Sequence, residues 1–169
     1  TAYASLGAIQ LARGDRIAAE AAFKKAVDAA PRTAQTHLAL ANYYLAVGRQ
    51  ADAESELKAA LAINPKHLLA NRAIAYFYVA TGRVAAAEPY LKTAADVSAD
   101  AASKLVLASY YASQRRPDDA RRVLEQVVTA GADGVTAARL QLASLSFAEQ
   151  DAKTANAHVD AVLAKEPSN

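Results

Sequence analysis

Hydrophobic and polar residues alternate with helical spacing along the chain, and the segment from Ala39 to Pro65 shows the pattern clearly. It contains two amphipathic runs that are joined by one glycine and closed by a proline. Alanine stands at many positions where a helical core would ordinarily have bulky residues. Because apolar residues at this spacing lie on one face of a helix, the segment predicts two helices that approach each other closely.

The same pattern recurs along the whole chain with a nearly constant period. Subtracting successive residue numbers of one apolar position gives spacings of 34, 34, 33 and 35 residues. These positions are Leu6, Leu40, Ile74, Leu107 and Leu142. In the same register an alanine precedes a large apolar residue by one helical turn, in the pairs Ala19 and Phe23, Ala53 and Leu57, Ala87 and Leu91, Ala120 and Leu124, and Ala155 and Val159. A fixed period of this length predicts a repeat array rather than an unrelated helical bundle.

Glycine follows the first run of the first three repeats, at Gly14, Gly48 and Gly82. A left-handed glycine ends a helix without a steric penalty, so these positions predict tight turns. Arg115 and Gln150 stand at the equivalent positions later in the chain. Either these two residues adopt a left-handed conformation, at a cost of about 1 to 2 kcal/mol, or the turns have another shape. We expect another shape around Arg115.

Two prolines modify the helices that the pattern predicts. Pro117 is expected at the first position of a helix, where Asp118 and Asp119 would favour the N-terminus electrostatically. Pro89 lies within a predicted second helix of the third repeat. We expect it to remove one backbone hydrogen bond and to bend that helix.

The repeated unit resembles the tetratricopeptide repeat, a 34-residue helix-turn-helix with a W-x2-L-G-x2-Y, A-x3-F and P pattern. The first repeat carries this pattern best, at Tyr3, Leu6, Gly7, Ala19, Phe23 and Pro31. The tyrosine of the family pattern recurs at Tyr44, Tyr78 and Tyr111, whereas Gln10 and Ser146 depart from it. Pro65 and Pro167 also close repeats, but Ala99 and Ala132 replace the proline, which leaves two repeat boundaries less sharply specified.

The resemblance covers the whole chain and implies its architecture. The expected fold is all-α, a right-handed α-solenoid of five antiparallel helix pairs in a single domain, 1–169. The approximate repeats are 1–33, 34–67, 68–100, 101–135 and 136–169.

Composition and charge narrow the classes of function. The chain has 19 basic and 17 acidic residues, well interleaved, so its net charge of +2 creates no field that favours nucleic acid or membranes. Cysteine is absent from the sequence, which excludes disulfides, thiol nucleophiles and thiolate metal sites. No apolar run approaches the roughly 18 residues of a membrane span. Because the sequence begins with Thr1, we expect a fragment of a larger protein. Its alanine-rich composition and its use of arginine are typical of bacterial proteins. The sequence leaves the compartment open, either the cytoplasm or the cell envelope.

The residues that could carry chemistry do not form a catalytic pattern. His37, His67 and His158 are far apart and lack both HExxH-like spacing and a convincing triad arrangement. Acidic pairs such as Glu54 and Glu56 are explained by helix starts and solvated outer faces. We therefore expect no catalytic residue, no metal site and no cofactor.

One basic cluster makes RNA binding an alternative function. The cluster consists of Arg115, Arg116, Arg121 and Arg122. Interleaved carboxylates and the lack of an aromatic stacking series beside the arginines count against RNA binding. A solvated turn, or a rim contact for an acidic partner, is the preferred interpretation.

The resemblance also implies a binding surface, because in such proteins the first helices line a concave groove that binds a peptide or another protein. The expected groove residues are Leu38, Asn42, Leu45, Arg72, Tyr76, Val79, Leu105, Ser109, Leu140, Ser144 and Phe147. Packing of these residues against each other, or against a continuation of the array, is the alternative. The carboxylate clamp of chaperone-binding relatives is not expected. Of the positions that correspond to the clamp residues of those relatives, only Asn42 is polar in this sequence.

The sequence therefore predicts a non-catalytic scaffold for protein–protein interaction. Alternatives are a regulatory or docking module of a larger enzyme or of an envelope export or assembly protein, RNA binding, and a structural oligomeriser. The helix after Thr154 is expected to expose a side formed by Val159, Val162 and Leu163, through which the chain could self-associate.

Overall fold

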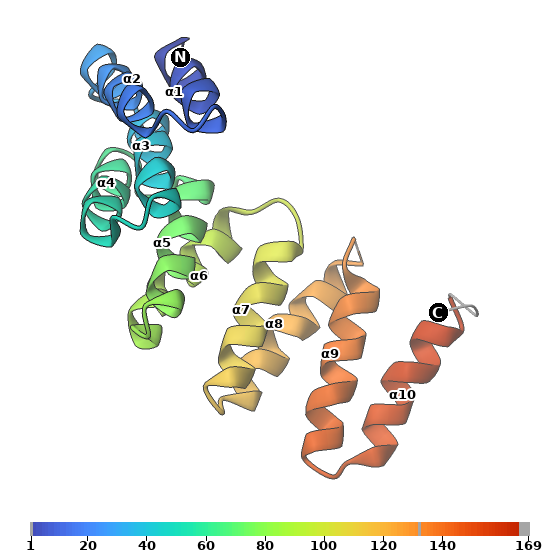
Figure 1. The fold of residues 1–169 in the computed structure, drawn as a ribbon. Coiled ribbons are helices and arrows are strands. Elements are labelled where there is room, and N and C mark those ends of the chain that lie inside the picture. Colours follow the sequence, from blue (N-terminus) through green and yellow to red (C-terminus); the bar gives the residue numbers. More distant parts are fainter. Residues whose placement is uncertain (1, 132, 166–169) are drawn as a thin grey trace. The chain divides into compact units, whose positions relative to one another are not determined.

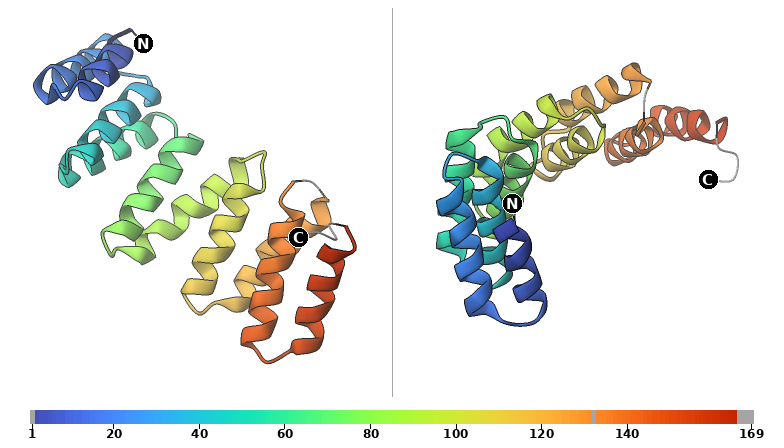
Figure 2. Two further views of the ribbon diagram at one scale, coloured as in Figure 1. Left: turned by 45° about the vertical axis from the view of Figure 1, so that its right-hand side comes forward. Right: turned by 90° about the horizontal axis from the view of Figure 1, so that it is seen from above.

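The structure is a computed structural model that describes residues 2–131 and 133–165, and within these ranges it contains ten α-helices and no strand. The helices are α1 (Ala2–Ala12), α2 (Arg16–Ala29), α3 (Ala34–Ala46), α4 (Gln50–Ile63), α5 (Leu68–Ala80), α6 (Val84–Val97), α7 (Ala102–Ser113), α8 (Pro117–Ala130), α9 (Val135–Ala148) and α10 (Ala152–Leu163). Helices pack in antiparallel hairpins, α1 with α2, α3 with α4, α7 with α8 and α9 with α10 (Figures 1 and 2). The predicted class, all-α helix-pair repeats, is confirmed.

The helices belong to two compact units, Thr1–Tyr90 and Leu91–Asn169. The first unit contains α1 to α5 and the start of α6, and the second contains the end of α6 and α7 to α10. The repeat boundaries at residues 33, 67, 100 and 135 stay a prediction, and Ala132 and Pro167 lie outside the described residues.

Alanine acts as the spacer between paired helices. The recurrent alanine of the second helix is buried in every repeat, from Ala19 to Ala155. The same close approach appears at Gly7 in α1, where an added Cβ would lie 2.9 Å from the Phe23 ring. Since the Gly7 backbone contacts the Phe23 ring and the recurrent alanines are buried, a bulky residue at either position would push the helix pair apart.

The turns between paired helices all use a left-handed residue. The φ angles are 83° at Gly14, 80° at Gly48 and 75° at Gly82, as predicted. Arg115 and Gln150 are also left-handed, with φ angles of 56° and 64°, so the expectation of another turn shape around Arg115 is wrong.

A backbone hydrogen bond that recurs at the turns of Gly14, Gly48, Arg115 and Gln150 explains why these turns share one shape. The amide of Arg49 donates to the carbonyl of Tyr44 at 2.8 Å, and the amide of Arg116 donates to the carbonyl of Tyr111 at 2.9 Å. This six-to-one bond satisfies a helix-terminal carbonyl and requires a left-handed residue just before the donor. Arg115 therefore keeps the turn and bears the backbone strain.

The two prolines behave differently. Pro117 is at the start of α8, with Asp118 and Asp119 in its first turn, as predicted. Pro89 lies inside α6, which runs unbroken from Val84 to Val97. The predicted bend of α6 stays a prediction.

Among the described residues, none of the helices has the length and apolar character needed to span a bilayer.

Candidate functional site

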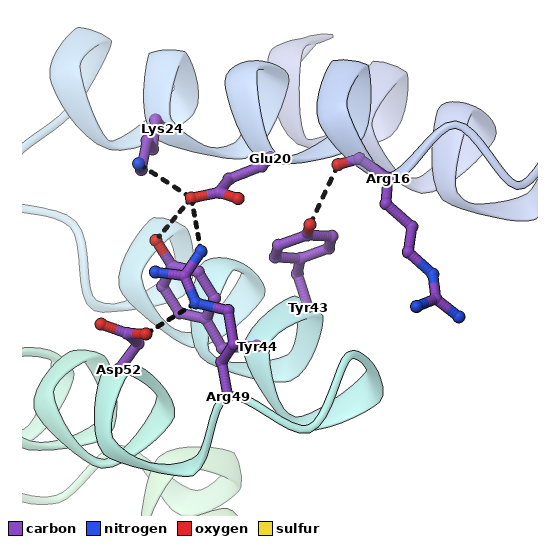
Figure 3. A network of polar contacts seen from close by, with 7 residues as sticks. All are labelled: Arg16, Glu20, Lys24, Tyr43, Tyr44, Arg49 and Asp52. Carbon is purple, nitrogen blue, oxygen red and sulfur yellow. Dashed lines mark hydrogen bonds and ion pairs between the residues drawn. The ribbon is translucent and has the colours of Figure 1, made fainter.

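A network of polar contacts joins α2 to the following repeat in the first unit (Figure 3). Arg49 binds Glu20 at 2.8 Å and Asp52 at 2.7 Å, and its guanidinium lies over the Tyr44 ring. Lys24 binds the same Glu20 carboxylate at 2.8 Å, and Tyr44 donates to it at 3.4 Å. The hydrogen bond from Lys24, followed by that from Arg49, lowers the pKa of Glu20 despite partial burial. Through Tyr44 and Arg49, the network holds α3 and the start of α4 against α2.

The same arrangement recurs one repeat later around Glu54. Its carboxylate accepts hydrogen bonds from Arg83 at 2.8 Å, Lys58 at 2.8 Å and the Tyr78 hydroxyl at 3.1 Å. These contacts, chiefly that with Arg83, lower the pKa of Glu54 to about 2. The Glu54 side chain is only 18% exposed, so the prediction of a solvated outer-face carboxylate is wrong for this residue. Two of the three partners, Tyr78 and Arg83, lie 24 and 29 positions further along the chain, which a local pattern cannot reveal.

Ion pairs also occupy most of the basic cluster in the second unit. Arg116 and Arg122 both bind Asp119, at 2.6 and 3.0 Å, and Arg116 is the main cause of the lowered pKa of that carboxyl. Arg121 binds Asp118 at 3.2 Å and Glu149 at 2.5 Å. The charges of the Arg121–Glu149 pair are reversed relative to those of the Glu20–Arg49 pair, because here the arginine lies on the earlier helix, α8. The pairing neutralises the charge that RNA binding would need.

The histidines lie in separate environments. His37 contacts Glu56 at 2.7 Å and the Pro31 carbonyl at 3.1 Å, so Glu56 also has a structural partner. His67 caps α5 by accepting from the amide of Ala70 at 3.2 Å. Burial lowers the pKa of His158, and the charge of Arg139 lowers it further. Within residues 2–131 and 133–165, no group of three or more histidine, cysteine or acidic side chains could hold a metal ion.

The predicted groove residues divide between the two units, and those of the first unit lie on α3 and α5. Tyr76 is 73% exposed and Val79 is also exposed, three residues further along the same face of α5. Arg72 and Leu45 are half-buried, and Asn42 is exposed. Leu38 differs from the rest, because it is only 3% exposed and therefore belongs to the core.

The groove residues of the second unit lie on α7 and α9. Phe147 is 74% exposed, and Leu140 is exposed seven residues, or about two turns, earlier on α9, whereas Leu105 is half-buried. Ser109 and Ser144 are exposed, but each hydroxyl donates to the carbonyl four residues earlier in its own helix, at 3.0 Å.

Two exposed apolar residues on the same helices were missing from the prediction. Leu69 is exposed seven residues before Tyr76, and Val106 is exposed three residues before Ser109. Both spacings place the residue on the same helix face as its partner, so helical periodicity applied to the whole of each first helix would have found them.

The final helix only partly follows the sequence prediction. Val159 and Leu163 are exposed on α10, as predicted. Val162 is buried, because it lies on the side of α10 that packs in the α9–α10 pair, and it cannot contribute to an exposed surface.

Sequence models described as tetratricopeptide repeat match residues 1–33, 44–110 and 101–130. The chain belongs to the tetratricopeptide repeat family. No curated protein matches its sequence. Proteins of this family are in general non-catalytic modules for protein–protein interaction.

Several solved structures have a similar fold. MamA has a TM-score of 0.76 at 22% identity, with coverage of 96% of this tetratricopeptide repeat chain and 95% of that chain. PilF of Pseudomonas aeruginosa has a TM-score of 0.71 at 22% identity, covering 95% of this chain and 73% of that one. YrrB, described as a TPR protein with an unusual peptide-binding site, has a TM-score of 0.72 at 16% identity, and the match covers 99% of this chain and 86% of that one. At these identities the likeness concerns the fold alone.

Proposed function

We propose that the chain is a non-catalytic scaffold that binds a peptide or protein segment in a groove lined by first helices, α3 and α5 in the first unit or α7 and α9 in the second. The observation that carries this proposal is the exposure of large apolar and aromatic side chains on those helices. Tyr76 is 73% exposed and Phe147 is 74% exposed, and Leu69 and Leu140 are exposed on the same two helices. Aromatic side chains of this kind supply much of the affinity in protein interfaces when a partner covers them.

The description of YrrB as a peptide-binding protein of the same fold supports the proposal. The ion pairing of Arg116, Arg121 and Arg122 disfavours the RNA alternative, since phosphate contacts would have to displace intramolecular carboxylates.

The test is affinity capture from a lysate of the source organism, with the wild-type chain and an Arg72→Ala/Tyr76→Ala variant as baits. Ile17→Ala is the matched control, because Ile17 is an exposed apolar residue on α2 rather than on a first helix. We expect partners that the wild type and the control retain and the double variant loses. Mass spectrometry identifies them, and circular dichroism checks that each bait is folded. Identical capture by all three baits would refute a role for the α5 surface.

A further inference from the structure

We propose that the surface shared by α7 and α9 binds a partner segment that is apolar and carries no charge where it touches this surface. The inference rests on the proposed function and adds the chemistry of the ligand. It concerns the second unit alone, in which α7 and α9 pack beside each other (Figure 1).

Three large apolar side chains project from this surface. Val106 on α7 and Leu140 and Phe147 on α9 are exposed to solvent. The apolar surface of each side chain is removed from water only when a partner covers it. Burial of this surface is therefore the driving force for association.

The two serine hydroxyls at the centre of the surface already donate their hydrogen atoms within their own helices. The hydroxyls of Ser109 and Ser144 donate to the carbonyls of Leu105 and Leu140 within their own helices, each at 3.0 Å. Their hydrogen atoms are therefore already used, and a carboxylate brought to this surface would compete with the helix backbone for them.

Charged side chains of α7 and α9 lie away from the surface. Lys104 and Arg139 each precede a surface serine by five residues, which places them about 140° around the helix. Residues within about 60° of Ser109 and Ser144 on the two helices are alanine, leucine, valine, serine, glutamine or phenylalanine.

A charged residue on the partner would lose its hydration at this surface without gaining an opposite charge. An uncharged apolar segment avoids that cost and also buries Val106, Leu140 and Phe147. Electrostatic complementarity therefore selects an apolar segment, such as the apolar side of an amphipathic helix. The α5 surface of the first unit differs, because Arg72 lies between Leu69 and Tyr76 there.

The experiment measures binding of three synthetic helical peptides to the whole chain by isothermal titration calorimetry. Each peptide has 14 residues, the length of α9. The first has an apolar face of leucine and alanine, and the other two carry one glutamate or one lysine at the centre of that face.

We expect the uncharged peptide to bind with a dissociation constant that changes less than about twofold between about 50 mM and 500 mM salt, since no ion pair is screened. Both charged peptides should bind at least about tenfold more weakly. Phe147→Ser should weaken binding of the uncharged peptide at least about fivefold, because it removes the most exposed anchor. Tyr76→Ser, the matched loss of an exposed aromatic residue in the first unit, should leave it within about twofold.

Equal affinity for all three peptides, strong salt dependence, or no binding of the uncharged peptide overturns the inference. Loss of binding in Tyr76→Ser but not in Phe147→Ser also overturns it, while supporting a groove on the first unit. These outcomes leave the capture experiment as the separate test of the proposed function, since that test uses the natural partners.

Discussion

Glu54 shows how much a single carboxylate contributes to the stacking of one repeat on the next. It accepts hydrogen bonds from Lys58 in its own helix and from Tyr78 and Arg83 in the next repeat. Because its folded-state pKa is about 2 and its ordinary value is 4.5, the folded state binds the carboxylate form more strongly. The resulting stability is complete above pH 4.5 and is lost as the pH falls toward 2.

We expect Glu54→Gln to lower the free energy of unfolding at pH 7 by about 1 kcal/mol, because the amide keeps the shape but loses the charge. The loss should shrink as the pH falls from about 4.5 to about 2, since the wild-type carboxylate is then protonated. Urea unfolding followed by circular dichroism at several pH values measures both effects. Asp28→Asn, at an exposed carboxylate of α2, is the control. A deficit of the same size at pH 2 would mean that packing, not charge, is responsible.

At the scale of the helix pair, the start of the second helix serves two different purposes. Asp15 and Asp151 cap α2 and α10 by accepting from backbone amides at 2.9 and 3.0 Å. Arg49 and Arg116 occupy the same position before α4 and α8, and neither provides a side-chain cap. Arg49 reaches back to Glu20 instead, so it replaces local capping with a contact between repeats.

The turn itself gives a prediction at this scale. Arg115→Gly and Gln150→Gly should each raise the free energy of unfolding by about 0.5 to 1 kcal/mol, because glycine removes the left-handed strain at φ angles of 56° and 64°. Thermal and urea unfolding measure the change. The reverse substitution, Gly48→Ala, should lower stability by about 1 kcal/mol, through backbone strain alone, since no atom lies within 4 Å of the added Cβ. Destabilisation by either glycine substitution would show that the arginine or glutamine side chain outweighs the strain.

At the scale of the whole molecule, equivalent residues have different surroundings along the array. Leu40 is 3% exposed, whereas Leu6, at the same position of the first repeat, is 43% exposed. Leu40 packs in a cluster with Phe23 and Tyr44, from helices on both sides of the junction between repeats. The repeat pattern alone assigns the two leucines the same role.

We therefore expect Leu40→Ala to cost about 3 kcal/mol of stability and Leu6→Ala less than about 1 kcal/mol. The pair is matched in chemistry and in repeat position, so the difference isolates burial between repeats. Equilibrium urea unfolding of the two variants measures it. Equal costs would mean that Leu6 is covered in solution, for example by self-association, and a concentration series would then reveal it.

The local pattern was sufficient to predict the helices, the repeat period, the alanine spacers and the start of α8 at Pro117. These features depend on residues within a few positions of one another, and a period of about 34 residues states them five times. The left-handed turns at Gly14, Gly48 and Gly82 were predictable for the same reason.

The candidate surface was predictable only as a set of helix positions. Periodicity placed Tyr76 and Phe147 on first helices, and their exposure agrees with that placement. It could not distinguish Leu38 and Val162, which are buried, from their exposed neighbours, because a helix face is wide and its edge depends on the packing of the next helix.

The sequence by itself determined the repeating unit, because helix formation and the pairing of adjacent helices depend on short-range spacing. The tertiary structure alone decided which side chains remain exposed, that Glu54 binds Arg83, and that Arg115 keeps the glycine-like turn. Burial and inter-repeat ion pairs depend on residues far apart in the chain. The strained turn is imposed by the backbone hydrogen bond that closes the helix, whatever residue occupies the position.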